Sequence, residues 1–211
     1  KAELRRQMDA IDLTVRLGGR YCRTLSGQAR PGLDRDRAIG WCVEMIREAC
    51  AYARDRGILL VMENHYKDGL WTHPEFALRS EVFLRIVSRI DSPAFGVNFD
   101  PSNAVVAGED PVVLLQQVKH LVRSVHASDR YLEGGSVEDL RKMALEPGLG
   151  YTSVLKHGVI GRGLNDYDAI FSILRIAGFD GWISIEDGMN GMEDLHASVA
   201  FLRRKIAQYF G

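Results

Sequence analysis

The sequence predicts an α/β fold built on a parallel sheet. Short apolar runs alternate regularly with amphipathic helical segments, which is the pattern of repeated strand–helix units. The run at 58–62 is apolar throughout, as in strands that are buried on both faces. About five such units fit into the 211 residues, and either a doubly wound sheet or a (β/α)8 barrel accounts for them.

In the first half of the chain, each expected helix has apolar residues at spacings of three and four. Gly18 and Gly57 end the first two helices. The segment Thr72-His-Pro-Glu75 has the pattern of a capping box with proline at the helix start. The expected elements are a helix at 1–17, a strand at 21–25, a helix at 36–56, a strand at 58–62 and a helix from 72 to about 90.

In the second half, Asp110-Pro111 and Asp166 are helix starts, because aspartate caps the first free backbone N–H groups of a helix. A long, weakly patterned connection covers 131–156. The expected elements are a strand at 95–99, a helix from 110, a strand at 122–127, a helix from 166, a strand at 182–185 and a helix at 194–209.

Composition excludes several classes of protein. The chain has 27 Lys+Arg against 28 Asp+Glu, so a general polyanion binder is not expected, and no nucleic-acid partner is predicted. Its three cysteines are too few and too irregular for a disulfide framework, which favours a reducing, cytoplasmic compartment. The apolar runs are far shorter than the roughly 20 residues of a membrane helix, so no membrane partner is predicted either.

An ionisable residue follows each of four expected strands at its carboxyl end. These residues are Glu63, Asp100, His126 and Glu186. Ligands bind at this end of parallel α/β sheets, and in a barrel the four ends converge on one axis. Separate salt bridges or helix caps would explain each residue alone, but clustered carboxylates repel one another unless a cation or a proton is present.

Three carboxylates and one imidazole form a plausible site for one divalent cation. Oxygen-rich ligation favours Mn²⁺ or Mg²⁺, with Mn²⁺ expected first, and the histidine also admits Co²⁺, Fe²⁺ or Zn²⁺. His65 can point to the same side as Glu63, two positions earlier. The glycine-rich turn after His157, which contains Arg162, can present backbone N–H groups to a phosphate or a sugar hydroxyl, although a plain turn explains it equally well.

The order of these motifs resembles the xylose-isomerase-like barrel superfamily, which includes sugar-phosphate isomerases and epimerases, inosose dehydratases and endonuclease IV. The resemblance is carried by Glu63-Asn-His, Asn98-Phe-Asp-Pro-Ser-Asn103, Val125-His-Ala-Ser-Asp129, Gly161-Arg-Gly163 and Gly181-Trp-Ile-Ser-Ile-Glu186. It implies a (β/α)8 barrel whose first strands are absent here. Residues 1–211 would then form a single partial barrel domain, preceded in the natural protein by roughly 70–90 residues.

The resemblance also implies roles for the strand-end residues. In the ketose epimerases of the superfamily, matching residues hold one metal ion, and the two glutamates, here Glu63 and Glu186, also move protons. Asn103 stands where the epimerases have a histidine, and Asp129 takes the place of an acidic substrate contact. Compared with endonuclease IV, Asn103 and Leu155 replace two zinc ligands, which favours one metal ion.

The expected function is therefore a metal-dependent isomerase or epimerase of carbohydrate metabolism, acting on a sugar or sugar phosphate through an enediolate. His65, Asn103, His157 and Arg162 are the expected contacts to hydroxyl groups of a small sugar or polyol. The alternatives are an inosose-type dehydratase, an endonuclease IV-like repair enzyme and a sugar-binding barrel without catalysis. A homo-oligomer is compatible with the sequence.

Overall fold

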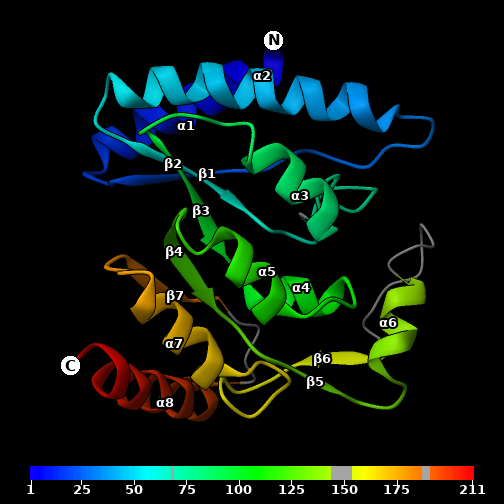
Figure 1. Cartoon of the computed structure of the whole chain (residues 1–211), viewed down its shortest axis with the longest axis vertical. Helices are drawn as coiled ribbons and strands as arrows, with labels where there is room; N and C mark the ends of the chain where they lie inside the picture. Colours follow the sequence, from blue (N-terminus) through cyan, green and yellow to red (C-terminus); the bar gives the residue numbers. More distant parts are fainter. Residues whose placement is uncertain (68, 144–153, 187–190) are drawn as a thin grey trace. The chain divides into compact units, whose positions relative to one another are not determined.

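The computed structural model describes residues 1–67, 69–143, 154–186 and 191–211 (Figure 1). The chain divides into two compact units, Lys1–Asn98 and Phe99–Gly211. The expectation of a single domain stays a prediction. None of the helices in the described part is long and apolar enough to cross a membrane.

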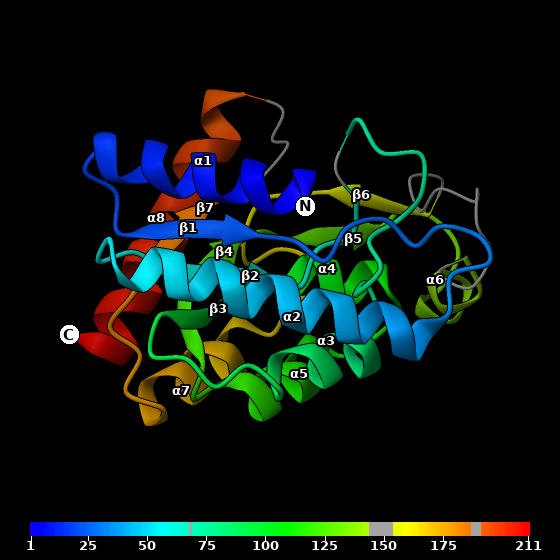
Figure 2. The same cartoon turned by 90° about the horizontal axis from the view of Figure 1, so that it is seen from above.

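The first unit has three parallel strands and three helices. Its elements are α1 (Ala2–Arg16), β1 (Tyr21–Thr24), α2 (Arg35–Arg54), β2 (Leu59–Glu63), α3 (Ser80–Val87) and β3 (Phe95–Phe99), whose last residue belongs to the second unit. The pairing places Thr24 beside Met62 and Glu63 beside Asn98. Helices α1 and α2 lie side by side along β1 (Figure 2).

The core of the first unit follows from the helical spacing seen in the sequence. The buried residues of α2 recur every three or four positions and face the sheet, whose own residues Leu60 and Met62 are fully buried. Asp34 begins α2 by accepting a hydrogen bond from Arg37 N at 2.8 Å. Phe83 and Ile86 of α3, both fully buried, complete the packing.

The second unit carries two pairs of strands. Its elements are α4 (Pro101–Val106), α5 (Pro111–Val118), β4 (Val122–Ala127), β5 (Arg130–Leu132), α6 (Val137–Met143), β6 (Leu155–His157), α7 (Tyr167–Ile176), β7 (Trp182–Ile185) and α8 (Met192–Phe210). Strand β4 pairs with β7 in parallel, whereas β5 and β6 form a short antiparallel pair (Figure 1). Aromatic rings of α7 and α8 pack against one another.

The strands expected at 95–99, 122–127 and 182–185 are confirmed to the residue. The strand expected at 21–25 ends one residue earlier, and the strand expected at 58–62 is shifted by one residue. The helix expected from 72 is wrong in its start, since α3 begins at Ser80. Residues 72–79 lie against the segment after β1 instead, where Phe76 N donates to Gly27 O at 2.7 Å. Helix α4 was not expected.

The connection expected over 131–156 is wrong in part. It contains the end of β5, helix α6 and the start of β6, while 144–153 lie outside the described residues. These elements are only three to seven residues long. Elements this short offer too little periodicity for a sequence pattern to reveal.

Candidate metal centre

Asp100 is held at the start of α4, directly after β3. Its Oδ1 accepts hydrogen bonds from Ser102 N at 2.8 Å, Asn103 N at 3.1 Å and Ser128 Oγ at 2.8 Å. The side chain is buried, with 3% of the residue exposed. The same carboxylate therefore caps the helix and has its orientation fixed by three donors.

His126 and Glu186 face each other across the β4–β7 pair. His126 lies opposite Ser184, and Glu186 follows two residues later, with its backbone N donating to Ala127 O at 3.0 Å. His126 Nδ1 is in contact with Glu186 Oε2. The side chain of His126 is 21% exposed and that of Glu186 is 47% exposed, so a small molecule from solvent can reach the pair.

The structure thus brings three of the four predicted ligands together in the second unit. Asp100, His126 and Glu186 each offer one ligand atom, and these atoms lie within 4.8 Å of one another. Two atoms that each lie about 2.0–2.4 Å from a shared ion can be no farther apart than about this distance. Two carboxylates and an imidazole therefore fit a divalent cation in both spacing and chemistry.

Glu63, the fourth predicted ligand, is the last residue of β2 in the first unit. It is fully buried, and its Oε2 accepts a charge-assisted hydrogen bond from Arg23 Nη1 of β1 at 2.6 Å. A buried carboxylate needs such a partner, because an unpaired charge is costly away from water. The β2–β3 register sets Glu63 beside Asn98, two residues before Asp100 along the chain.

His65 lies two residues beyond Glu63 and pairs with a glutamate that the sequence analysis placed in a helix cap. Its Nδ1 is 3.0 Å from Oε2 of Glu75, which is 1% exposed. Burial of the imidazole opposes protonation, but the hydrogen bond to Glu75 and the charges of Glu63 and Glu75 outweigh it and raise the pKa of His65. The contacts of Glu75 were not predicted, because Ser26, which donates two hydrogen bonds to it, lies 49 positions earlier in the sequence.

The other expected substrate contacts have distinct surroundings. Asn103 is buried in the first turn of α4, beside Asp100. His157 lies opposite Arg130 in the β5–β6 pair, and its Nε2 is 2.9 Å from Arg130 Nη1. A guanidinium only donates, so this nitrogen of His157 accepts. Arg162 lies exposed in the loop after β6.

Asp129 corrects two expectations at once. It is fully buried, and its Oδ2 accepts hydrogen bonds from Gly161 N at 2.8 Å and Gly163 N at 3.0 Å. Its Oδ1 accepts from Arg130 N at 2.9 Å and Asn165 N at 3.2 Å. The donors of the glycine-rich turn therefore bind a carboxylate of the chain itself and not a phosphate or sugar, and Asp129 is no substrate contact.

This loop has a glycine where its backbone meets the carboxylate. A Cβ at Gly163 would lie 2.2 Å from Oδ1 of Asp129, which only glycine avoids. Burial raises the pKa of Asp129, although its hydrogen bonds from the backbone of Gly163, Asn165, Gly161 and Arg130 act in the opposite direction.

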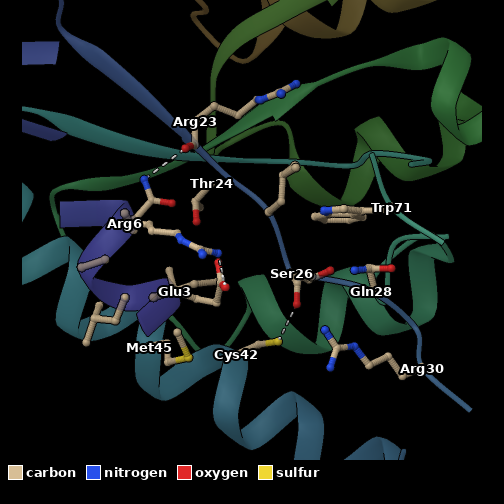
Figure 3. Close-up of a pocket in the computed structure, with 16 residues that line it drawn as sticks. Glu3, Arg6, Arg23, Thr24, Ser26, Gln28, Arg30, Cys42, Met45 and Trp71 are labelled. Carbon is tan, nitrogen blue, oxygen red and sulfur yellow. Dashed lines mark hydrogen bonds and ion pairs between the residues drawn. The ribbon is translucent and has the colours of Figure 1, made fainter. Parts of the chain in front are cut away.

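A cavity of about 580 Å³ in the first unit lies between the start of α1, the end of β1 and α2 (Figure 3). Arg23, Ser26 and Trp71 are among its lining residues. Cys42 donates a hydrogen bond through Sγ to Ser26 O at 3.4 Å. Burial and the charge of Glu75 raise the pKa of the Cys42 thiol to about 11, so at neutral pH it is a thiol and not a thiolate nucleophile.

Comparisons with known proteins agree with this architecture. Residues 1–205 match the family described as xylose isomerase-like TIM barrel. An inosose dehydratase from Bacillus thuringiensis (strain Al Hakam) is 27% identical over 137 residues, which are 64% of this chain and 42% of that protein. The chain thus matches about two fifths of the length of this curated relative.

Two solved structures share the fold. The IOLI protein with a binding zinc atom has a TM-score of 0.73 at 16% identity, over 98% of this chain and 69% of that one. An L-ribulose 3-epimerase has a TM-score of 0.71 at 15% identity, over 98% of this chain and 67% of that one. The expectation of an α/β fold of the TIM-barrel type is confirmed, and the chain belongs to the xylose isomerase-like TIM barrel family.

Proposed function

We propose that the protein is a metal-dependent isomerase or epimerase of a small sugar, sugar phosphate or related polyol. The observation that carries the proposal is the convergence of Asp100, His126 and Glu186 within 4.8 Å at the carboxyl ends of parallel strands. These ends carry the active sites of TIM-barrel enzymes. The chain belongs to the xylose isomerase-like TIM barrel family, and the solved structures that share its fold include an L-ribulose 3-epimerase.

Glu63 is proposed as the fourth ligand. It offers a carboxylate oxygen at the carboxyl end of β2, beside the strand that leads to Asp100. Arg23 donates a hydrogen bond to Oε2 of Glu63, which orients the carboxylate. A bound divalent ion, with Mn²⁺ expected first and Mg²⁺, Co²⁺ or Zn²⁺ as alternatives, would stabilise the negative charge that develops on a substrate oxygen.

The two glutamates are proposed to move the proton. Glu186 is the better placed base, since its side chain is 47% exposed and can be reached by a substrate, whereas Glu63 is fully buried. It takes the proton beside the substrate carbonyl, and an enediolate results. Glu63 returns a proton on the opposite face or at the neighbouring carbon, after it has itself taken up a proton from solvent. General base catalysis of this kind contributes roughly 10²–10⁴-fold to the rate.

His65, Asn103, His157 and Arg162 are proposed to bind substrate hydroxyl groups. Asn103 is the neighbour of the ligand Asp100 in the first turn of α4. Arg162 lies on the loop that Asp129 fixes, so its backbone position is well defined.

The three cysteines are thiols, in keeping with a reducing compartment such as the cytoplasm.

Dehydration of an inosose-like ring is the second candidate, and the 27% identical inosose dehydratase favours it. It begins with the same proton abstraction and continues with loss of a β-hydroxyl group. The repair-enzyme alternative gains no such support, because Leu155 is a buried apolar residue at one of the places where endonuclease IV has a zinc ligand.

The test is proton exchange on a panel of keto sugars, their phosphates and inososes, in deuterated water with Mn²⁺ present. Isomerisation or epimerisation predicts solvent deuterium at the carbon next to the carbonyl, in a product of unchanged atom count. Dehydration predicts a product that has lost one water. A metal-loaded protein that exchanges no carbon-bound proton on any member of the panel would contradict both reactions.

A further inference from the structure

The buried carboxylate of Glu75 in the first unit links the segment after β1 to His65, which follows the proposed ligand Glu63 by two residues. Oε1 of Glu75 accepts hydrogen bonds from Ser26 N at 2.6 Å and Ser26 Oγ at 2.8 Å. Its Oε2 is 3.0 Å from His65 Nδ1. Ser26 Oγ in turn accepts from Ala77 N at 2.9 Å, which fixes the segment that carries Glu75.

We propose that Glu75 is a positioning residue, which holds the imidazole of His65 with its proton on Nδ1 and leaves Nε2 for a hydroxyl group of the substrate. The proposal rests on the proposed function, because the hydroxyl group belongs to the sugar or polyol of that site. An ionised carboxylate only accepts hydrogen bonds, so the contact with Glu75 requires a proton on Nδ1 of His65.

The location of His65 supports a role at the site. It follows Glu63 by two residues, and it lies at the same carboxyl end of β2. Its side chain is 13% exposed, so the ring is enclosed but not sealed from a small molecule. A histidine that must present one particular nitrogen gains from a buried partner that sets its tautomer and ring orientation.

Two donors of Ser26 fix the orientation of Glu75 itself. The backbone N–H of Ser26 cannot turn away, and its acceptor is Oε1 of Glu75. With Oε1 held by Ser26, Oε2 of Glu75 is left facing His65. If Glu75 only anchored its loop, the hydrogen bonds from Ser26 would be sufficient. The additional contact with His65 therefore favours a role in positioning the imidazole.

Glu75→Gln separates these roles because an amide has one oxygen. The buried N–H of Ser26 requires that oxygen, since an unsatisfied buried donor is costly. The amide NH₂ then faces His65, whose Nδ1 must accept, and the ring proton moves to Nε2. The loop anchor is thus retained while the tautomer of His65 is inverted.

The experiment is ¹⁵N NMR of the full chain with labelled histidine, at a pH where the imidazole is neutral, together with steady-state kinetics. His65→Gln assigns the His65 signal by removing it. The wild type should show the proton on Nδ1, and Glu75→Gln should show it on Nε2, with kcat reduced about 10–100-fold and KM changed less. Glu81→Gln makes the same chemical change at an exposed residue and should match the wild type.

A wild-type signal with the proton on Nε2 overturns the proposal without any variant. An unchanged tautomer in Glu75→Gln, or an inverted tautomer with unchanged kcat, overturns it as well. Metal uptake and proton exchange by the wild type test the proposed function separately. The wild type could fail to take up metal or exchange a proton while His65 carries its proton on Nδ1 and Glu75→Gln moves that proton to Nε2. This result would contradict the proposed function and its substrate but would still support the positioning of His65 by Glu75.

Discussion

The carboxylate of Asp129 should be the main support of the loop that follows β6. We expect Asp129→Ala to destabilise the second unit by about 2–4 kcal/mol, from a cost of roughly 1–3 kcal/mol for each buried donor that loses its acceptor. Two of its four donors, Arg130 N and Asn165 N, are buried, while those of Gly161 and Gly163 are partly buried and can turn to water. Burial of the carboxylate is itself unfavourable, which is why the pKa of Asp129 is raised, and the substitution removes this cost. The expected loss of stability is therefore smaller than the full sum for the two buried donors.

The assay is urea unfolding of the full chain combined with amide hydrogen exchange. Asp129→Asn retains one oxygen, so its loss of stability should be smaller than that of Asp129→Ala. The exchange of the Asn165 amide should accelerate in both variants. Asp91→Ala, a change at an exposed aspartate, serves as the control and should stay within about 0.5 kcal/mol of the wild type. An Asp129→Ala variant that is as stable as this control would refute the reasoning.

Three further predictions concern the first unit. The pKa of Asp12 is lowered, chiefly by the hydrogen bond from Arg56 and also by that from Tyr52. The stability that ionised Asp12 contributes is therefore fully present above its usual pKa of 3.8 and is lost as the pH falls through the lowered value. Asp12→Asn should remove this part of the acid sensitivity in circular dichroism titrations. The Cys42 thiol, with its pKa of about 11, should react with a maleimide at neutral pH far more slowly in the folded protein than in urea, and equal rates would contradict its raised pKa. Phe83→Ala should cost about 3–5 kcal/mol in urea unfolding, because the ring is fully buried, and a cost below about 1 kcal/mol would mean that α3 does not pack as described.

The strands could be predicted because their signals are local, and the candidate metal ligands because they lie at the ends of those strands. A run such as 95–99 shows its burial in its own composition, and Asp100-Pro101 shows its helix cap in two adjacent residues. The carboxyl ends of parallel strands share one edge of the sheet, so the closeness of the three candidate ligands Asp100, His126 and Glu186 follows from topology.

The errors come from residues whose partners are far away in sequence. Thr72-His-Pro-Glu75 has the local signature of a capping box, but Glu75 is drawn to Ser26, 49 positions earlier, and to His65. Likewise Asp129 binds a turn more than 30 residues later. Such tertiary hydrogen bonds override local propensity and leave no periodic pattern in the sequence.

The central claim is that Asp100, His126 and Glu186, with Glu63, hold one divalent ion that catalysis requires. The most direct measurement is the metal content of the full chain after loading with Mn²⁺ and dialysis, for the wild type and for His126→Ala. We predict about one ion per chain in the wild type and a loss of most of it in the variant, because an imidazole ligand is removed while the carboxylate that caps α4 stays in place. A folded wild type that retains no ion, or a His126→Ala variant that retains as much as the wild type, would contradict the claim.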